Sequence, residues 1–341
     1  MIEINSTSEY ILHQYPRGKD FDGIISNSCN IPFYTLNIDL KGECYICHCE
    51  SWLPISVGNI LDFDSLEDIW SSKLATILQD TVSEKKFTYC AVKHCGVATK
   101  EVYIDRYQIS LNIDESCNLA CPSCRPKMIN YIRGDIFEKK QQYINHFLSL
   151  LDKFSHPLEL TMCGNGDPIA SLIFRPLILH WMPKINQTVK LFTNGLLMKK
   201  ILPKSSIYPH INKYQISVDA GSKEVYENVR RPGKFEILQE NLEWLSKNIE
   251  PNITVHLMFC LQKSNASDII NFSNMCQQYG CVGNISKLDN WATFDNFNDH
   301  DVVDNTSHPL HKIAFEQLNE VKTLPHILLN NYLKMAMSRY A

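Results

Sequence analysis

From Tyr107 to about residue 290, apolar strand-like segments alternate with helix-like segments. The expected strands are 107–113, 157–163, 188–193, 213–218, 252–261 and 281–288. The expected helices between them are 135–154, 169–181, 196–202, 222–229, 235–249 and 265–279. Repeated strand–helix units favour a parallel sheet covered by helices. Because six units are too few for a closed eight-stranded barrel, the pattern predicts an α/β fold with a partial (β/α)6 TIM-like barrel, whose functional residues lie at the carboxyl ends of the strands.

Three cysteines follow the first of these strands on one short loop. Cys117, Cys121 and Cys124 have the spacing C-x3-C-x2-C. Soft thiolates suit an iron–sulfur cluster, and three ligands for a four-iron cube leave one iron open to a small molecule. A zinc knuckle is the alternative, although structural zinc sites use four ligands and this loop contains no fourth Cys or His.

The cysteine spacing resembles the signature of radical S-adenosylmethionine (AdoMet) enzymes, and motifs at later strand ends extend the resemblance. They are Gly164-Asn165-Gly166-Asp167-Pro168, which is similar to the family's Gly-Gly-Glu-Pro, then Thr193-Asn194-Gly195, Ser217-Val218-Asp219, Arg230-Arg231 and Gln262-Lys263-Ser264-Asn265. Asn165 and Asp167 depart from the family pattern, which has Gly and Glu at these positions. The resemblance covers roughly residues 105–290.

The resemblance implies a [4Fe-4S] cluster that binds AdoMet and cleaves it reductively to a 5′-deoxyadenosyl radical, which abstracts a hydrogen from the substrate. It also implies a low-potential electron donor such as flavodoxin or ferredoxin. AdoMet contacts are expected from Gly164, Asn165, Gly166, Asp167, Asn194, Ser217, Asp219, Arg231 and Gln262. Arg231 is favoured over Arg230 as the partner of the AdoMet carboxylate.

The first hundred residues contain six more cysteines, Cys29, Cys44, Cys47, Cys49, Cys90 and Cys95. A hairpin is expected over 33–40 and 43–49, followed by a helix at 66–70. This segment resembles the SPASM/Twitch modules that hold auxiliary clusters, although those normally follow the barrel. The resemblance implies a second [4Fe-4S] cluster on Cys29, Cys47, Cys90 and Cys95, with Cys44 and Cys49 in reserve. A structural zinc ion on the same four thiolates is the alternative.

Bulk properties exclude several functional classes. A net charge of −4 gives no electrostatic reason to bind nucleic acid. Neither a transmembrane run nor a secretory signal is apparent, so a cytoplasmic protein without a membrane partner is expected. The odd count of 13 cysteines favours metal binding in a reducing compartment over a disulfide framework.

Three domains are therefore expected: the auxiliary module over 1–104, the barrel over 105–290, and a C-terminal part over 291–341. The C-terminal part begins with an acidic, aromatic loop at 294–301, for which a substrate-facing lid and an ordinary surface loop are both open. Helices are expected at 308–322 and 324–340.

The leading hypothesis is a radical AdoMet enzyme of oxidoreductase or isomerase type that modifies a ribosomal peptide by epimerisation or crosslinking. Dehydrogenation or epimerisation of a sugar or another small molecule is the alternative reaction. A non-enzymatic, metal-stabilised binding module is the alternative of another class. Among the remaining cysteines, Cys260 is the candidate hydrogen donor, whereas Cys163, Cys276 and Cys281 are expected to be buried apolar side chains.

Overall fold

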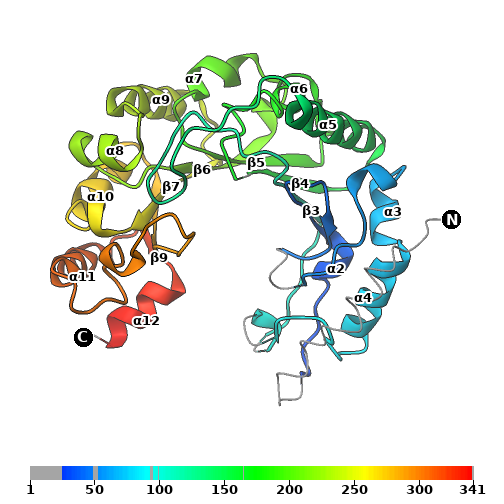
Figure 1. Ribbon diagram of the computed structural model, residues 1–341, viewed down its shortest axis with the longest axis horizontal. Helices are drawn as coiled ribbons and strands as arrows, with labels where there is room; N and C mark the ends of the chain where they lie inside the picture. The colour runs from blue at the N-terminus through cyan, green and yellow to red at the C-terminus, as the bar shows by residue number, and fades with distance from the viewer. Residues whose placement is uncertain (1–24, 49–52, 93–94, 99, 164, 340–341) are drawn as a thin grey trace. The chain divides into compact units, whose positions relative to one another are not determined.

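The computed structural model describes residues 25–48, 53–92, 95–98, 100–163 and 165–339. They fall into two compact units. The first unit comprises Met1–Glu115, Tyr131–Asn165 and Ile173–Val189, and the second comprises Ser116–Asn130, Gly166–Leu172 and Lys190–Ala341. Figure 1 labels the helices and strands of both.

The first unit contains four strands and the helices that cover them. Its strands are β1 (Thr35–Ile38), β2 (Cys44–Tyr45), β3 (Tyr107–Leu111) and β4 (Leu158–Met162). Its helices are α2 (Ile31–Tyr34), α3 (Leu66–Trp70), α4 (Lys73–Ser83), α5 (Asp135–Lys153) and α6 (Arg175–His180). The strand β5 (Gln187–Thr193) begins in this unit and ends in the second.

The predicted N-terminal hairpin and helix are confirmed. In the hairpin β1 pairs with β2 antiparallel, with Ile38 opposite Cys44. The helix is α3, and α4 follows it without having been expected. Strand β1 also pairs in parallel with β3, so the hairpin extends the sheet that begins the barrel. The expected boundary at residue 104 therefore does not coincide with a break in hydrogen bonding.

Aromatic packing fixes the N-terminal segment on the first barrel strand. The Tyr107 ring on β3 lies 4.8 Å from the Trp70 ring and 5.1 Å from the Phe154 ring, measured between centroids. The Trp70 indole also donates a hydrogen bond to the Thr35 carbonyl at 3.1 Å. Buried rings of this size contribute much of the apolar area that holds a sheet and its helices together.

The second unit continues the alternation of strands and helices. Its strands are β6 (Ile211–Ser217), β7 (Thr254–Leu261), β8 (Val282–Lys287) and β9 (Ile327–Leu329). Its helices are α7 (Met198–Ile201), α8 (Lys223–Val229), α9 (Phe235–Asn248), α10 (Ile269–Gln278), α11 (His311–Val321) and α12 (Asn331–Arg339). Strands β6 to β9 pair in parallel in chain order.

Helices of the second unit lie on the outer side of its strands (Figure 1). The packing is tight at Gly283 on β8, where a Cβ atom would stand 2.9 Å from both Cys276 and Phe272 of α10. Along β7 the buried residues Val255, Leu257, Phe259 and Leu261 alternate with half-buried ones, as expected for a strand with one face under helices.

The sheet order is β2-β1-β3-β4-β5-β6-β7-β8-β9. The sheet is mostly parallel and does not close, which confirms the predicted partial barrel with a small N-terminal module. Two predictions differ from the structure in the helices. The helix expected at 169–181 is only α6, and the segment 324–340 contains β9 before α12. None of the described helices has the length and apolarity needed to cross a membrane.

Candidate active site

The three-cysteine loop of the second unit is closed by its own backbone. The Cys117 amide donates to the Ile129 carbonyl at 2.7 Å, which joins the two ends of the loop. The Cys124 and Arg125 amides both donate to the Cys121 carbonyl at 2.9 Å, which forms a tight turn under the last two cysteines. The structure therefore gathers the three predicted ligands on one constrained loop.

Each of the three sulfurs accepts an N–H from a different polar side chain. The donor–sulfur distances are 3.9 Å from Asn194 Nδ2 to Cys117, 3.6 Å from Arg230 Nη1 to Cys121, and 3.4 Å from Arg125 Nε to Cys124. Donors of this kind stabilise a thiolate, and hydrogen bonds to the sulfurs help to set the potential of an iron–sulfur cluster.

The thiol groups favour metal binding over a free thiolate. Burial and the nearby Asp167 raise the pKa of Cys117 to about 11. Burial also raises the pKa of Cys121, against the opposing effect of the Arg230 guanidinium. Such thiols stay protonated at neutral pH unless a metal replaces the proton. The three cysteines with their N–H donors therefore fit an iron–sulfur cluster, which Cys117, Cys121 and Cys124 would hold.

The described residues do not form a site for a single metal ion. Among the residues with described positions, no three His, Cys, Asp or Glu side chains gather closely enough to ligate a single ion. A four-iron cube is larger than one ion, so its thiolates stand further apart than zinc ligands do. The described side chains of the loop are therefore not arranged around a single ion.

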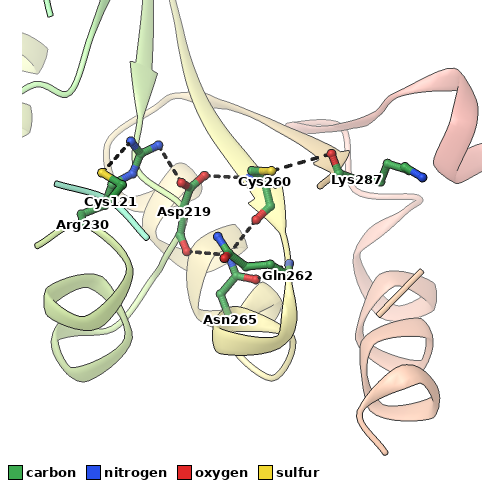
Figure 2. A network of polar contacts seen from close by, with 7 residues as sticks. All are labelled: Cys121, Asp219, Arg230, Cys260, Gln262, Asn265 and Lys287. Carbon is green, nitrogen blue, oxygen red and sulfur yellow. Dashed lines mark hydrogen bonds and ion pairs between the residues drawn. The ribbon is translucent and has the colours of Figure 1, made fainter. Parts of the chain in front are cut away.

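Arg230 also belongs to a buried network at the ends of β6 and β7 (Figure 2). Its Nη2 atom lies 2.6 Å from Asp219 Oδ2, and the other carboxylate oxygen accepts the Cys260 amide at 2.7 Å. The Asn265 amide group donates to the carbonyls of Asp219 and Cys260, at 2.9 Å each. Burial raises the pKa of Asp219, while Arg230 and the Cys260 N–H favour the carboxylate. The network thus fixes the arginine that contacts Cys121.

The structure places Asp167 at the centre of a second buried network. Its carboxylate accepts hydrogen bonds from the Thr193 hydroxyl at 2.8 Å, from the backbone N–H of Asn194 at 2.6 Å and from the backbone N–H of Ala170 at 3.0 Å. Burial raises the pKa of Asp167, and these hydrogen bonds oppose the shift. The carboxylate therefore holds the end of β5 beside its own loop, and it positions Asn194 against Cys117. Its expected contact with the AdoMet ammonium stays a prediction.

The other predicted AdoMet contacts are spread over the strand ends. Ser217 is half-buried at the end of β6. Gln262 is buried directly after β7, and its backbone N–H donates to Asn265 Oδ1 at 2.8 Å. Asn165 and Gly166 are described, whereas Gly164 lies outside the described residues. These assignments stay predictions.

Arg230 contacts the cysteine Cys121, and the expected contact of Arg231 with the AdoMet carboxylate stays a prediction. Arg231 is exposed, while its carbonyl accepts the Ala120 amide at 2.6 Å. Arg230 is the residue that directly follows α8, and its backbone amide donates to the Tyr226 carbonyl at 2.8 Å.

Arg125 was missed because nothing distinguished it within the loop. It follows the third cysteine directly, and no general pattern assigns a role to that position. Its side chain is 9% exposed, so the loop buries a charged group beside the exposed Cys124.

The first unit brings four of the N-terminal cysteines to one cavity of about 280 Å³. Cys29, Cys47, Cys90 and Cys95 all line it, and apolar side chains form much of its wall. Burial raises the pKa of Cys29 to about 11. Burial also raises the pKa of Cys90, and the thiolates of the other three cysteines add to the shift. Four mutually repelling thiolates in an apolar cavity fit a metal cluster that neutralises them.

The reserve cysteines differ in position. Cys44 is buried and its thiol points to the Gly42 carbonyl at 3.9 Å, away from the residues that line the cavity. Cys49 lies outside the described residues. His48 also lines the cavity. Which of these residues bind the auxiliary cluster stays a prediction.

Cys260, the candidate hydrogen donor, is part of the network in Figure 2. Its thiol donates to the Lys287 carbonyl at 3.7 Å, and burial raises its pKa. The side chain therefore carries an S–H group at neutral pH, which a hydrogen donor requires. Of the cysteines expected to be buried apolar side chains, Cys276 and Cys281 are buried. For Cys163 the expectation is wrong, because this side chain is half-buried and donates to Asn112 Oδ1 at 2.8 Å.

Comparison with known families agrees with this geometry. The sequence model of the radical SAM superfamily matches residues 111–276. This chain contains a radical SAM domain. The model of the SPASM iron–sulfur cluster-binding domain matches residues 29–96, ahead of the radical SAM domain. The chain therefore contains a radical SAM domain preceded by a SPASM domain, and domains of these two kinds imply a [4Fe-4S] cluster, AdoMet and auxiliary iron–sulfur clusters as cofactors.

Solved structures with similarity to the chain include Streptococcus suis SuiB bound to precursor peptide SuiA, at 12% identity and a TM-score of 0.44, covering 81% of this chain and 58% of that one. Native anSMEcpe with bound AdoMet and Cp18Cys peptide is 15% identical with a TM-score of 0.45, covering 67% and 63%. TYW1 with a lysine-pyruvate adduct is 18% identical with a TM-score of 0.36, covering 59% and 70%. The radical SAM chain thus spans less than two thirds of the SuiB chain. The search of curated proteins finds no match.

Proposed function

We propose that this radical SAM enzyme modifies a ribosomal peptide by hydrogen abstraction, through epimerisation or crosslinking. When bound, the cluster and AdoMet supply, on one-electron reduction, methionine and a 5′-deoxyadenosyl radical that takes a hydrogen atom from the substrate. The observation that carries the proposal is the loop on which all three cysteine sulfurs accept side-chain N–H donors. The SPASM segment supports a peptide substrate, because modules of this kind accompany many radical AdoMet enzymes that modify peptides.

The chain's own residues have three tasks in this proposal. Arg230 and Arg125 place positive charge beside two ligand sulfurs, which favours addition of an electron at the cluster. Asp167 holds the loop that follows β4 against the end of β5. Buried apolar strands beneath these residues keep water from a reactive radical.

Cys260 would distinguish epimerisation from crosslinking. In epimerisation, its S–H gives a hydrogen atom to the substrate carbon radical, and the resulting thiyl radical takes one electron from a low-potential donor and one proton. In crosslinking, no hydrogen returns to the substrate and Cys260 is not consumed. The thiol is 3.7 Å from the Lys287 carbonyl, so a packed strand end fixes its position.

The test is the formation of 5′-deoxyadenosine from AdoMet and dithionite by anaerobically reconstituted protein. Wild type is expected to release 5′-deoxyadenosine, and the Cys117→Ala, Cys121→Ala and Cys124→Ala variants are expected to release none. Iron and sulfide analysis of the same samples shows whether the cluster is loaded. Absence of cleavage by a fully loaded wild type, or cleavage by a variant without the loop cysteines, would refute the proposal.

Peptides and nucleotide sugars are then compared as stimulants of 5′-deoxyadenosine release. A peptide dependence agrees with the proposed substrate class. Stimulation by a nucleotide sugar alone would agree with the radical chemistry but would contradict the peptide substrate and support the small-molecule alternative.

A further inference from the structure

A cavity of about 440 Å³ in the second unit has two cationic walls. Its lining residues are Ala120, Pro122, Arg125, Pro126, Met128, Arg231, Pro232, Thr293 and Phe294. The described lining therefore contains two guanidinium groups, one hydroxyl and otherwise apolar side chains, but no carboxylate. Guanidinium groups bind carboxylates in a two-pronged geometry, so Arg231 can bind an anion here, while the charge of Arg125 also acts on the loop cysteines.

The walls of the cavity are held in place from both sides. Arg125 is 9% exposed, and its Nε atom is fixed on Cys124 at 3.4 Å. On the opposite wall, Phe294 stacks on His300 with ring centroids 3.7 Å apart and planes at 12°. The His300 carbonyl accepts the Lys263 amide at 3.0 Å, so the ring pair is tied to the end of β7. A cavity with fixed walls can bind a ligand with little loss of its own conformational freedom.

Large apolar side chains are exposed on and near this cavity. Met128, which lines it, is 54% exposed, and Trp291, three residues before Phe294, is 72% exposed. Exposed aromatic and methionine side chains beside arginine are typical of surfaces that bind another chain. The combination matches a peptide segment in which an acidic residue adjoins an apolar one.

The cavity is separate from most of the residues expected to contact AdoMet. Asn194, Ser217 and Asp219 do not line it, and Arg231 is the member of the predicted AdoMet set that does. Arg230, which contacts Cys121, is also not among the lining residues. Arg231 is therefore assigned to the substrate instead of to the AdoMet carboxylate.

We propose that this cavity binds an Asp or Glu side chain of the peptide substrate, with a neighbouring apolar residue packed on Met128 and Phe294. The proposal rests on the proposed peptide substrate and adds an acidic anchor to it. Arg125 and Arg231 form its charged walls, and the loop at 291–294 supplies its aromatic wall. The acidic, aromatic loop at 294–301 thus contributes Phe294 to this binding site.

The test uses a display library of random twelve-residue peptides, selected on the reconstituted holoenzyme with AdoMet present. Wild type is expected to enrich Asp and Glu at least threefold over the input library, with an apolar residue next to the acid. The Arg231→Gln variant and the Arg125→Lys/Arg231→Gln variant are expected to lose this enrichment. Lys127→Gln is the matched control, because Lys127 is exposed on the same loop and does not line the cavity.

Three measurements distinguish loss of the cluster, loss of AdoMet binding and absence of the acidic anchor. Iron content checks that each variant keeps its cluster, and Arg231→Gln supplies a variant that changes no contact to a ligand sulfur. AdoMet binding by equilibrium dialysis is expected to be unchanged in Arg231→Gln, and its loss would assign the cavity to the AdoMet carboxylate. Equal enrichment in wild type and variants, or no acidic enrichment in wild type, would overturn the acidic anchor. Continued 5′-deoxyadenosine release in that case would leave the proposed radical chemistry standing.

Discussion

The buried ion pair between Asp219 and Arg230 predicts a large stability cost when either partner is changed alone. The two charged atoms lie 2.6 Å apart, and the side chains are 5% and 14% exposed. At an effective dielectric constant of about 20, the gross attraction is roughly 6 kcal/mol. Most of that attraction offsets the cost of removing both charges from water. Removing one partner leaves the other buried and uncompensated, which costs about 3–5 kcal/mol.

Asp219→Asn is the most suitable perturbation. Asp219 has a φ angle of 58°, in the left-handed region that Asn tolerates and most other residues do not. The variant therefore removes the charge with little backbone strain, and the Asn oxygen can still accept the Cys260 amide. Arg230→Met removes the other partner and keeps a long, flexible side chain. The double variant leaves no buried charge, so its cost is expected to be less than the sum of the single costs by about 2 kcal/mol.

The assay is urea unfolding of the reconstituted proteins under anaerobic conditions, with the four proteins of the cycle compared at the same iron content. Glu243→Gln is the control, because its ion pair with Lys247 is exposed and is expected to add nothing measurable. An Asp219→Asn variant as stable as the control would refute the reasoning, and so would additive costs in the double variant.

Three further predictions test other parts of the molecule. Cys90→Ala is expected to keep about four of about eight irons per chain, whereas Cys44→Ala keeps all of them; equal iron in both variants would remove the four-cysteine assignment. Burial and Lys213 lower the pKa of His256, so below pH of about 6.5 the unfolded chain takes up a proton that the folded chain does not, and stability falls. His256→Gln is expected to lose less thermal stability than wild type between pH 7 and pH 5, and an unchanged slope would contradict this. Gly221→Ala puts a Cβ atom 2.0 Å from the Phe272 backbone nitrogen and is expected to cost about 3 kcal/mol or more in urea unfolding, whereas Gly280→Asn, in open space, is expected to be mild.

The barrel strands could be predicted from sequence because their pattern is long and regular. In β4 the buried Leu158, Leu160 and Met162 alternate with half-buried residues, and a helix with one apolar face, α5, precedes the strand. The short segment Ile327–Leu329 gave no such pattern. Three apolar residues suit a strand or a helix equally, and pairing with β8 decides between them.

The thiolate ligands could be predicted because ligand chemistry fixes residue type and spacing. Their hydrogen-bond donors could not, since any Arg or Asn brought near a sulfur by the fold can donate. Asn194 reaches Cys117 from the end of β5, 77 positions away in the sequence. The contact of Arg230 with Cys121 depends on where α8 ends, and a sequence pattern places a helix end only to within about one or two residues.

The two cysteine groups differ in ways that predict different roles for their clusters. The loop of Cys117, Cys121 and Cys124 offers three thiolates, each with an N–H donor, so a four-iron cube bound there keeps one iron for AdoMet. The N-terminal cavity offers four thiolates and mostly apolar walls. Four ligands for four irons leave no iron open to substrate, and apolar walls exclude water and polar ligands. We therefore expect the auxiliary cluster to transfer electrons or stabilise the SPASM segment, and substrate binding to depend on protein side chains such as Arg125 and Arg231.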